Sequence, residues 1–181
     1  WIWMYQRDRS PINQVLMSLG LIQSPIGFLT DATAAWGPLS LPLLAVSSVR
    51  VWNGLPFVTV MLLAGLQSIP QELYEAAEID GASSVGKVRY ITLPMLAPVL
   101  TILVTLLLMG SLGHFEINFV MTMGGPRNLT NVLTVLAYQS AFSFFRFDLA
   151  SAISAIILVG ASIIAFFYIR AVLRERPESR G

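Results

Sequence analysis

Few side chains of this chain have the types and spacing that could do chemistry, and the clearest pattern lies in residues 81–88. This stretch reads GASSVGKV and matches the G-x-x-x-x-G-K pattern of phosphate-binding loops. Val88, however, stands where such a loop needs a Ser or Thr to ligate magnesium, and the loop must also follow a buried strand. The residues upstream favour a helix instead, so we do not expect nucleotide binding here.

Side chains for nucleophilic, acid–base or metal chemistry do not group together either. The chain has no cysteine and a single histidine, His114, which excludes thiolate metal sites, disulfides and cysteine nucleophiles. No set of His, Asp and Glu has metal-ligand spacing, no Ser has a plausible base, and no G-x-S-x-G motif occurs. We therefore expect no catalytic residue, no metal site and no cofactor in this chain.

Arg50 is the most unusual polar residue, because it lies within a long apolar stretch. It is eleven residues from the start of that stretch at Leu39, a depth of roughly 16 Å at 1.5 Å per residue in a helix. An ionisable group at such depth is functional or paired by default. An ion pair with Glu116 is one interpretation, and contact with an anion is another. Gly54 and Pro56 follow, and they predict a break in the helix beside a polar cavity.

The composition indicates that membrane-spanning helices position these residues. The chain is 55% hydrophobic and 12% charged, with a net charge of +1, whereas soluble domains average about 25% charged residues. This excludes an ordinary soluble domain, a disordered region and a nucleic-acid binder. Residues 37–66, 93–118 and 148–170 contain apolar stretches long enough to cross a bilayer. Residues 128–145 are uncharged but rich in Asn, Thr, Ser and Gln, which favours an interfacial or re-entrant helix over a lipid-facing span. We expect an all-α membrane protein with several transmembrane helices.

The positions of Lys and Arg near the ends of the spans predict their orientation. If residues 67–92 form a cytoplasmic loop, residues 1–36 are an external or interfacial segment, residues 119–147 are an external loop with an interfacial helix, and residues 171–181 are a cytoplasmic tail. Six basic residues then lie inside and four outside. The six are Lys87, Arg89, Arg170, Arg174, Arg176 and Arg180, and the four are Arg7, Arg9, Arg127 and Arg146.

The predicted cytoplasmic loop contains a short amphipathic helix. Ser68 followed by Gln71 is a pattern typical of a helix N-cap, and Gly81 suits a helix C-cap. The small side chains of Ala76 and Ala77 would allow this helix to fit a groove on another protein. A solvated connecting helix is the alternative.

Three stretches together resemble a known family. Residues 63–82 read LAGLQSIPQELYEAAEIDGA and are followed by ITLP at 91–94, residues 52–57 read WNGLPF, and Phe115-Glu116 precedes TMGGP at 122–126. They resemble the EAA loop, the broken helix and the Phe-acid to Thr-x-Gly-Gly-Pro segment of binding-protein-dependent ABC importer permeases of the maltose-type carbohydrate family. Such permeases usually have three more N-terminal spans, and this chain begins with Trp1. We therefore expect it to be a piece of a longer protein.

The resemblance implies a function and partners. It implies a non-enzymatic permease subunit of an ATP-driven importer, multi-pass in the bacterial or archaeal cytoplasmic (inner) membrane, with a cytoplasmic coupling helix. Cytoplasmic ATP-binding subunits would hold ATP and Mg, a second permease subunit would complete the pathway, and an extracytoplasmic solute-binding protein would deliver a sugar. No nucleic acid is expected. Alternatives are a charged solute such as glycerol phosphate, with Arg50 as its anion contact, and, in a different class, a passive channel or an intramembrane enzyme.

The resemblance also assigns residues to two sites. Residues that would couple to the ATPase are Glu75, Ala76, Ala77, Asp80, Gly81 and Ala82. Residues that would bind the substrate are Trp52, Asn53, Gly54, Phe57, Ser111, His114, Phe115 and Glu116.

Overall fold

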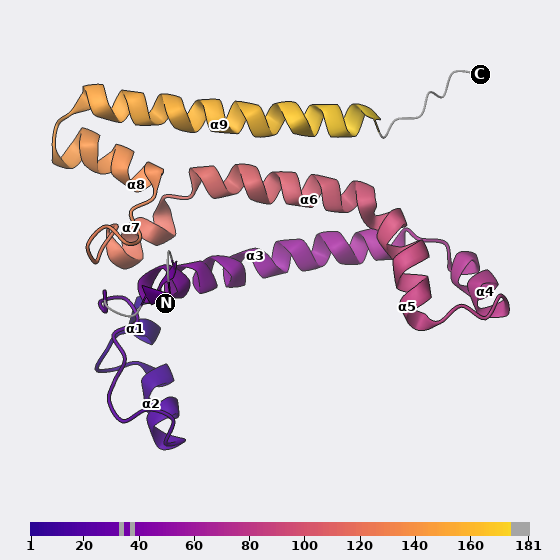
Figure 1. Cartoon of the computed structure of the whole chain (residues 1–181), viewed down its shortest axis with the longest axis horizontal. Coiled ribbons are helices and arrows are strands. Elements are labelled where there is room, and N and C mark those ends of the chain that lie inside the picture. Colours follow the sequence, from indigo (N-terminus) through magenta and orange to yellow (C-terminus); the bar gives the residue numbers. More distant parts are fainter. Residues whose placement is uncertain (33–34, 37–38, 175–181) are drawn as a thin grey trace. The chain divides into compact units, whose positions relative to one another are not determined.

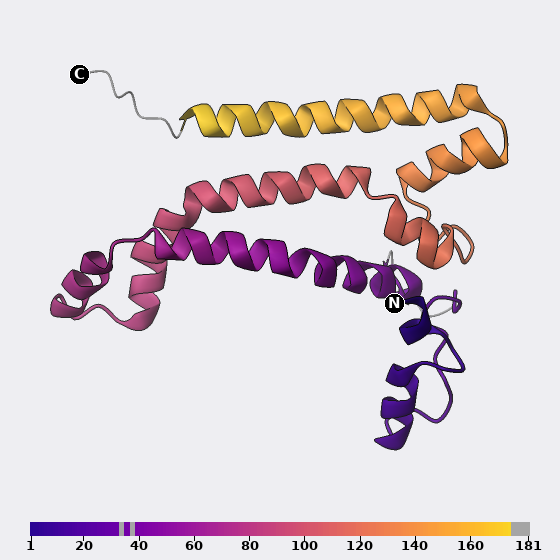
Figure 2. The same ribbon diagram turned by 180° about the vertical axis from the view of Figure 1, so that it is seen from behind.

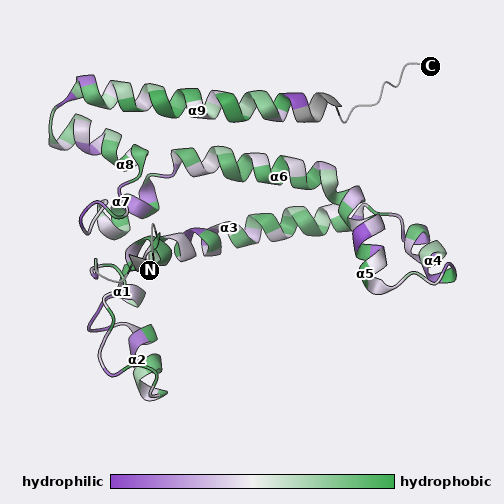
Figure 3. Ribbon diagram, viewed as in Figure 1, coloured by the Kyte–Doolittle hydropathy of each residue, from purple (hydrophilic) through white to green (hydrophobic). Residues whose placement is uncertain are grey.

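The computed structural model describes residues 1–32, 35–36 and 39–174 and is built almost entirely of helices (Figure 1). Its long helices are α3 (Leu41–Gln67), α6 (Leu93–Gly113) and α9 (Phe147–Arg174). Hydrophobic residues predominate along all three (Figure 3). By length and composition, three of the described helices could cross a membrane, as the apolar stretches predict.

The chain forms two compact units. The first contains residues 1–53 and 112–159, and the second contains residues 54–111 and 160–181. Of the predicted tail at 171–181, residues 175–181 lie outside the described part of the chain.

Helix α3 is continuous, so the predicted break at Gly54 and Pro56 is wrong. The helix runs through Pro56 for 27 residues from Leu41 to Gln67. Proline removes one backbone donor, the one that would bond to the carbonyl of Trp52. The neighbouring hydrogen bonds of a long helix remain. One missing bond therefore leaves the Trp52 carbonyl without its helical partner but does not end the helix.

Helix α4 (Gln71–Ile79) forms in the predicted cytoplasmic loop, with one correction at its start. Pro70 is the N-cap residue, and the hydroxyl of Ser68 donates to the carbonyl of Gly65 at 2.7 Å rather than capping α4. The predicted C-cap turn is present. Gly81 has a φ of +73°, its N–H donates to the carbonyl of Glu78 at 3.0 Å, and that of Ala82 donates to Ala77 at 2.9 Å. This pair of bonds is a Schellman motif, which favours glycine at its left-handed position.

The second half of the same loop belongs to a helix that is long and apolar enough to cross a membrane. Helix α5 (Ser84–Lys87) and the π-helix η1 (Val88–Thr92) lead directly into α6. Together they form one helix of 30 residues, Ser84–Gly113. The side chain of Ser83 caps its start by accepting from the N–H of Gly86 at 3.2 Å.

Helix α6 ends at Gly113, whereas the predicted span continued to residue 118. Phe115 is the N-cap of a separate short helix, α7 (Glu116–Thr122). The predicted span therefore extends too far, because it includes Glu116, the first charged residue after Gly113.

A buried polar cluster fixes α7 to the loop that follows it. Asn118, whose side chain is 1% exposed, donates to the carbonyl of Thr130 at 3.3 Å. The hydroxyls of Thr122 and Thr130 are 2.6 Å apart, and that of Thr130 donates to the carbonyl of Gly125 at 2.8 Å. Beyond this loop, α8 (Leu133–Tyr138) and the π-helix η2 (Gln139–Ser143) supply the helix predicted within residues 128–145.

The N-terminal segment contains α1 (Ile2–Tyr5), α2 (Pro11–Ser18) and a two-stranded antiparallel sheet of β1 (Ala35–Trp36) and β2 (Leu39–Ser40). Buried Asn13 organises it. Its amide donates to the carbonyls of Arg7 and Ile26, both at 2.9 Å, and its oxygen accepts from the N–H of Ile26 at 3.1 Å. This satisfies a buried amide and holds the loop before Ile26 against α2.

The orientation of the spans stays a prediction that cysteine labelling can test. Ser84 and Ser143 are both exposed, and the chain has no native cysteine. In intact cells, we expect a membrane-impermeant maleimide to label Ser143→Cys and to label Ser84→Cys only after the membrane is opened. Labelling of Ser84→Cys from outside would show that the orientation is reversed.

Candidate functional site

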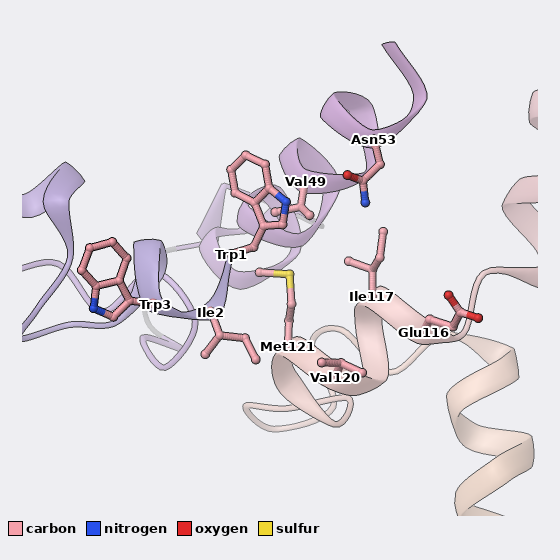
Figure 4. Close-up of a pocket in the computed structure, with 9 residues that line it drawn as sticks. All are labelled: Trp1, Ile2, Trp3, Val49, Asn53, Glu116, Ile117, Val120 and Met121. Atoms are coloured by element: carbon pink, nitrogen blue, oxygen red, sulfur yellow. The ribbon is translucent and has the colours of Figure 1, made fainter. Parts of the chain in front are cut away.

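A cleft of about 370 Å³ lies within the first compact unit (Figure 4). Its walls come from α1 and the residue before it, from α3 and from α7. Most of the lining is apolar, and Asn53 and Glu116 are the polar side chains in it. The lining residues are Trp1, Ile2, Trp3, Val49, Asn53, Glu116, Ile117, Val120 and Met121.

Helical periodicity explains why these side chains meet. Val49 and Asn53 are four residues apart on α3, and Ile117 and Met121 are four apart on α7, so each pair shares a helix face. Asn53 and Ile117 point toward one another in Figure 4.

A second hollow, of about 440 Å³, shares Asn53, Glu116 and Ile117 with the first. It is also lined by Gly113, His114 and Phe115 from the break between α6 and α7. The structure thus brings together four of the residues predicted to bind substrate: Asn53, His114, Phe115 and Glu116. Asn53 and Glu116 lie where both hollows meet.

Some predicted residues are engaged elsewhere. Trp52 is 60% exposed, and its ring is edge-on to that of Trp1 with the centroids 5.9 Å apart. Phe115 lines the second hollow, and its ring is also stacked on that of Phe119 with the centroids 4.7 Å apart. The hydroxyl of Ser111 donates to the carbonyl of its own helix at Leu108, 2.7 Å away. Gly54, Phe57 and Ser111 belong to the second compact unit and line neither hollow.

The ion pair between Arg50 and Glu116, one of the two interpretations of Arg50, is not formed. Among the described residues, the ion pairs within 4.0 Å are Lys87–Glu78 and Arg146–Asp148. Arg50 is half-buried in α3, one turn before Asn53. Its guanidinium therefore has no carboxylate partner in this part of the chain.

His114 remains uncharged over a wider pH range than an ordinary histidine. Partial burial lowers its pKa first, the charge of Arg50 lowers that pKa further, and the charge of Glu116 opposes the shift. A neutral imidazole has one donor and one acceptor nitrogen. The group beside the second hollow can consequently both donate and accept at neutral pH.

Sequence reasoning missed the apolar walls of the cleft. On α7, the i, i+4 spacing from Glu116 would have indicated Val120, and on α3 the same spacing from Asn53 would have indicated Val49. No sequence signal pairs Trp1 or Trp3 with α7, because the two segments meet only in the folded chain. The missed residues are Trp1, Ile2, Trp3, Val49, Ile117, Val120 and Met121.

The residues predicted to couple to an ATPase lie together on α4 and the turn after it. Glu75, Ala76, Asp80, Gly81 and Ala82 are exposed, and Ala77 is half-buried. The neighbouring Ile79 is 88% exposed. This end of the second unit therefore offers small and apolar side chains on an open surface.

Comparison with known proteins identifies a family. Residues 11–179 match the family described as "Binding-protein-dependent transport system inner membrane component". The chain is 38% identical over 159 residues to the trehalose/maltose transport system permease protein MalF of Thermococcus litoralis, covering 88% of this chain and 50% of that protein. It is 34% identical over 168 residues to the lactose transport system permease protein LacF of Rhizobium radiobacter, covering 91% and 54%.

A solved structure has the same fold. It is the crystal structure of a bacterial ABC transporter involved in the import of the acidic polysaccharide alginate, with a TM-score of 0.79 and 25% identity over 97% of this chain and 59% of that one. The chain spans about half the length of the curated relatives it matches. These matches confirm the resemblance to ABC transporter permeases, and the chain belongs to the family of binding-protein-dependent transport system inner membrane components.

Proposed function

We propose that this chain is part of the permease of an ATP-driven importer and forms part of the pathway for a sugar delivered by a solute-binding protein. The observation that carries this proposal is the cleft in which Asn53 and Glu116 stand beside apolar and indole side chains. The names of the relatives, which refer to trehalose and maltose or to lactose, support the same class of solute.

The cleft has the chemistry that a sugar needs. A sugar ring presents hydroxyl groups at its edge and apolar C–H groups on its faces. The amide of Asn53 can donate and accept hydrogen bonds, and the carboxylate of Glu116 accepts them. Trp1 and Trp3 provide flat apolar surfaces for the C–H faces. The volume of about 370 Å³ is within the range typical of small-molecule sites.

Helix α4 is the surface at which we propose that ATP hydrolysis acts. Cytoplasmic ATPase subunits would bind ATP and Mg, and closure of their dimer would move α4 and the attached spans to alternate access. Since three spans enclose little of a pathway, a second permease subunit would complete it. The assembly would lie in the cytoplasmic membrane of a bacterium or archaeon.

An acidic solute is a second candidate, and Arg50 favours it. Among the described residues its guanidinium has no carboxylate within 4.0 Å, and an unpaired charge within a membrane span is expensive. Guanidinium groups bind carboxylates and phosphates in a bidentate manner. The import of acidic alginate by the structural relative is consistent with this candidate.

Solute-stimulated ATP hydrolysis by the complete importer tests both candidates. Neutral disaccharides are compared with a uronate oligosaccharide and glycerol phosphate, in the wild type and in Arg50→Gln. The matched control is Arg146→Gln. The side chain of Arg146 is exposed, and its guanidinium is 4.0 Å from the carboxylate of Asp148, at the distance limit for an ion pair. We expect stimulation by a neutral sugar that survives both substitutions. Stimulation by acidic solutes alone, lost in Arg50→Gln but not in Arg146→Gln, would establish the second candidate. No stimulation by any of these solutes would contradict both.

A further inference from the structure

Two side-chain bridges join α4 to the helix that leads into the membrane. The hydroxyl of Tyr74 on α4 is 2.9 Å from that of Thr92, the last residue of η1. The ammonium of Lys87, at the end of α5, donates to the carboxylate of Glu78 at 2.5 Å. Figures 1 and 2 both show α4 lying beside α5.

The two bridges meet in one network. The hydroxyl of Thr92 also donates to the carbonyl of Lys87 at 3.5 Å, an arrangement in which the hydroxyl of Tyr74 donates to Thr92. The hydrogen bond and charge of Lys87 lower the pKa of Glu78, so the ion pair persists at neutral pH. We call these four residues, Tyr74, Glu78, Lys87 and Thr92, the brace.

The connection between α4 and α5 is short and is held by helix caps at both ends. The Schellman turn at Gly81 ends α4, and Ser83 caps α5 only two residues later. The backbone thus fixes the point where the two helices meet, and the brace fixes their separation farther along. Together these contacts define both the position and the direction of α4.

Apolar packing does little of this work. Every residue of α4 is exposed or half-buried in the described chain. Tyr74 and Thr92 are both half-buried, so their hydrogen bond is partly shielded from water. Because α4 buries little apolar surface, its orientation depends on a few polar contacts.

We propose that the brace makes α4 and the cytoplasmic end of α6 move as one body, so that displacement of α4 reaches the membrane span. Tyr74 and Thr92 are positioning residues in this proposal, and neither lines the cleft or the second hollow. This inference rests on the function proposed above, and it names the residues through which coupling passes.

The first test removes single hydroxyl groups. In the complete importer, Tyr74→Phe and Thr92→Val should insert and assemble normally. Solute taken up per ATP hydrolysed should fall about two- to twelve-fold, the population change expected from one neutral hydrogen bond. Thr92→Ser keeps the hydroxyl and should retain the wild-type ratio. The matched control is Tyr90→Phe, which loses the same group from a side chain that is 75% exposed.

The second test exchanges the charged pair. Glu78→Lys and Lys87→Glu each place two like charges together and should lower the same ratio. The double exchange restores an opposite pair and should recover most of it. A double variant with the ratio of the single variants would overturn the role of this pair.

Hydrogen exchange separates failure of the brace from failure of the proposed function. Amides of residues 72–79 should exchange faster in Tyr74→Phe than in the wild type or in Tyr90→Phe, whether or not the protein transports sugar. A wild-type importer without ATP-dependent uptake would contradict the proposed function. The rate of amide hydrogen exchange in α4 would then still test the brace. Unchanged exchange in Tyr74→Phe overturns the brace, and so does an unchanged ratio of uptake to hydrolysis in an active importer.

Discussion

Replacing Gly81 with proline is expected to abolish sugar uptake in a protein that still inserts into the membrane. Gly81 has a φ of +73°, and its N–H donates to the carbonyl of Glu78. Proline fixes φ near −65° and has no N–H, so it can neither take the positive φ nor donate the hydrogen bond of this turn. The end of α4 would change direction, and the surface proposed to contact the ATPase would be lost. Uptake and ATP hydrolysis are measured on the same membranes.

Gly20 provides a matched control for this substitution. It has a φ of +69°, its N–H donates to Met17 at 3.0 Å, and Leu21 donates to Leu16 at 2.9 Å, the same Schellman turn at the end of α2. Gly20→Pro should therefore damage a helix end equally without disturbing α4. Gly81→Asn should retain uptake, because asparagine tolerates left-handed backbone. Wild-type uptake in Gly81→Pro, or equal loss in Gly20→Pro, would contradict a specific coupling role.

Asn53→Leu is expected to weaken apparent solute affinity strongly. Asn53 lines both hollows, and leucine has a similar size but cannot form hydrogen bonds. Loss of two neutral hydrogen bonds to a sugar corresponds to about a five- to 140-fold loss of affinity. The half-saturating concentration for stimulated ATP hydrolysis measures the change. Thr59→Val, which removes an exposed hydroxyl from the same helix, should leave that concentration unchanged. An unaltered value in Asn53→Leu would place the solute elsewhere.

The long helices could be predicted from sequence because their apolar stretches are as long as a bilayer is thick. Their details could not. Pro56 favoured a break, yet one missing hydrogen bond does not end a helix of 27 residues. Conversely, α6 ends at Gly113, a residue type that commonly ends helices, whereas the predicted span continues past Glu116 to residue 118. The Gly81 turn was predictable because its requirement is local, a residue that tolerates positive φ.

The candidate cleft was predictable only where its residues lie in recognisable motifs. Asn53 and Glu116 stand in stretches that resemble the family, and the structure places both in the cleft. Trp1 and Met121 line the same cleft although they are far apart in the sequence, and periodicity along one helix cannot pair such distant segments.

Uptake of a radiolabelled sugar by proteoliposomes that contain the complete importer decides whether this chain belongs to an ATP-driven sugar permease. The sugar is the one that best stimulates hydrolysis, and the liposomes contain ATP or a non-hydrolysable analogue. We predict accumulation against the gradient only with ATP and the solute-binding protein together, and none in Gly81→Pro. Uptake that proceeds equally with the analogue, or that stops at equal concentrations on both sides, would show a passive pathway and contradict the proposed function.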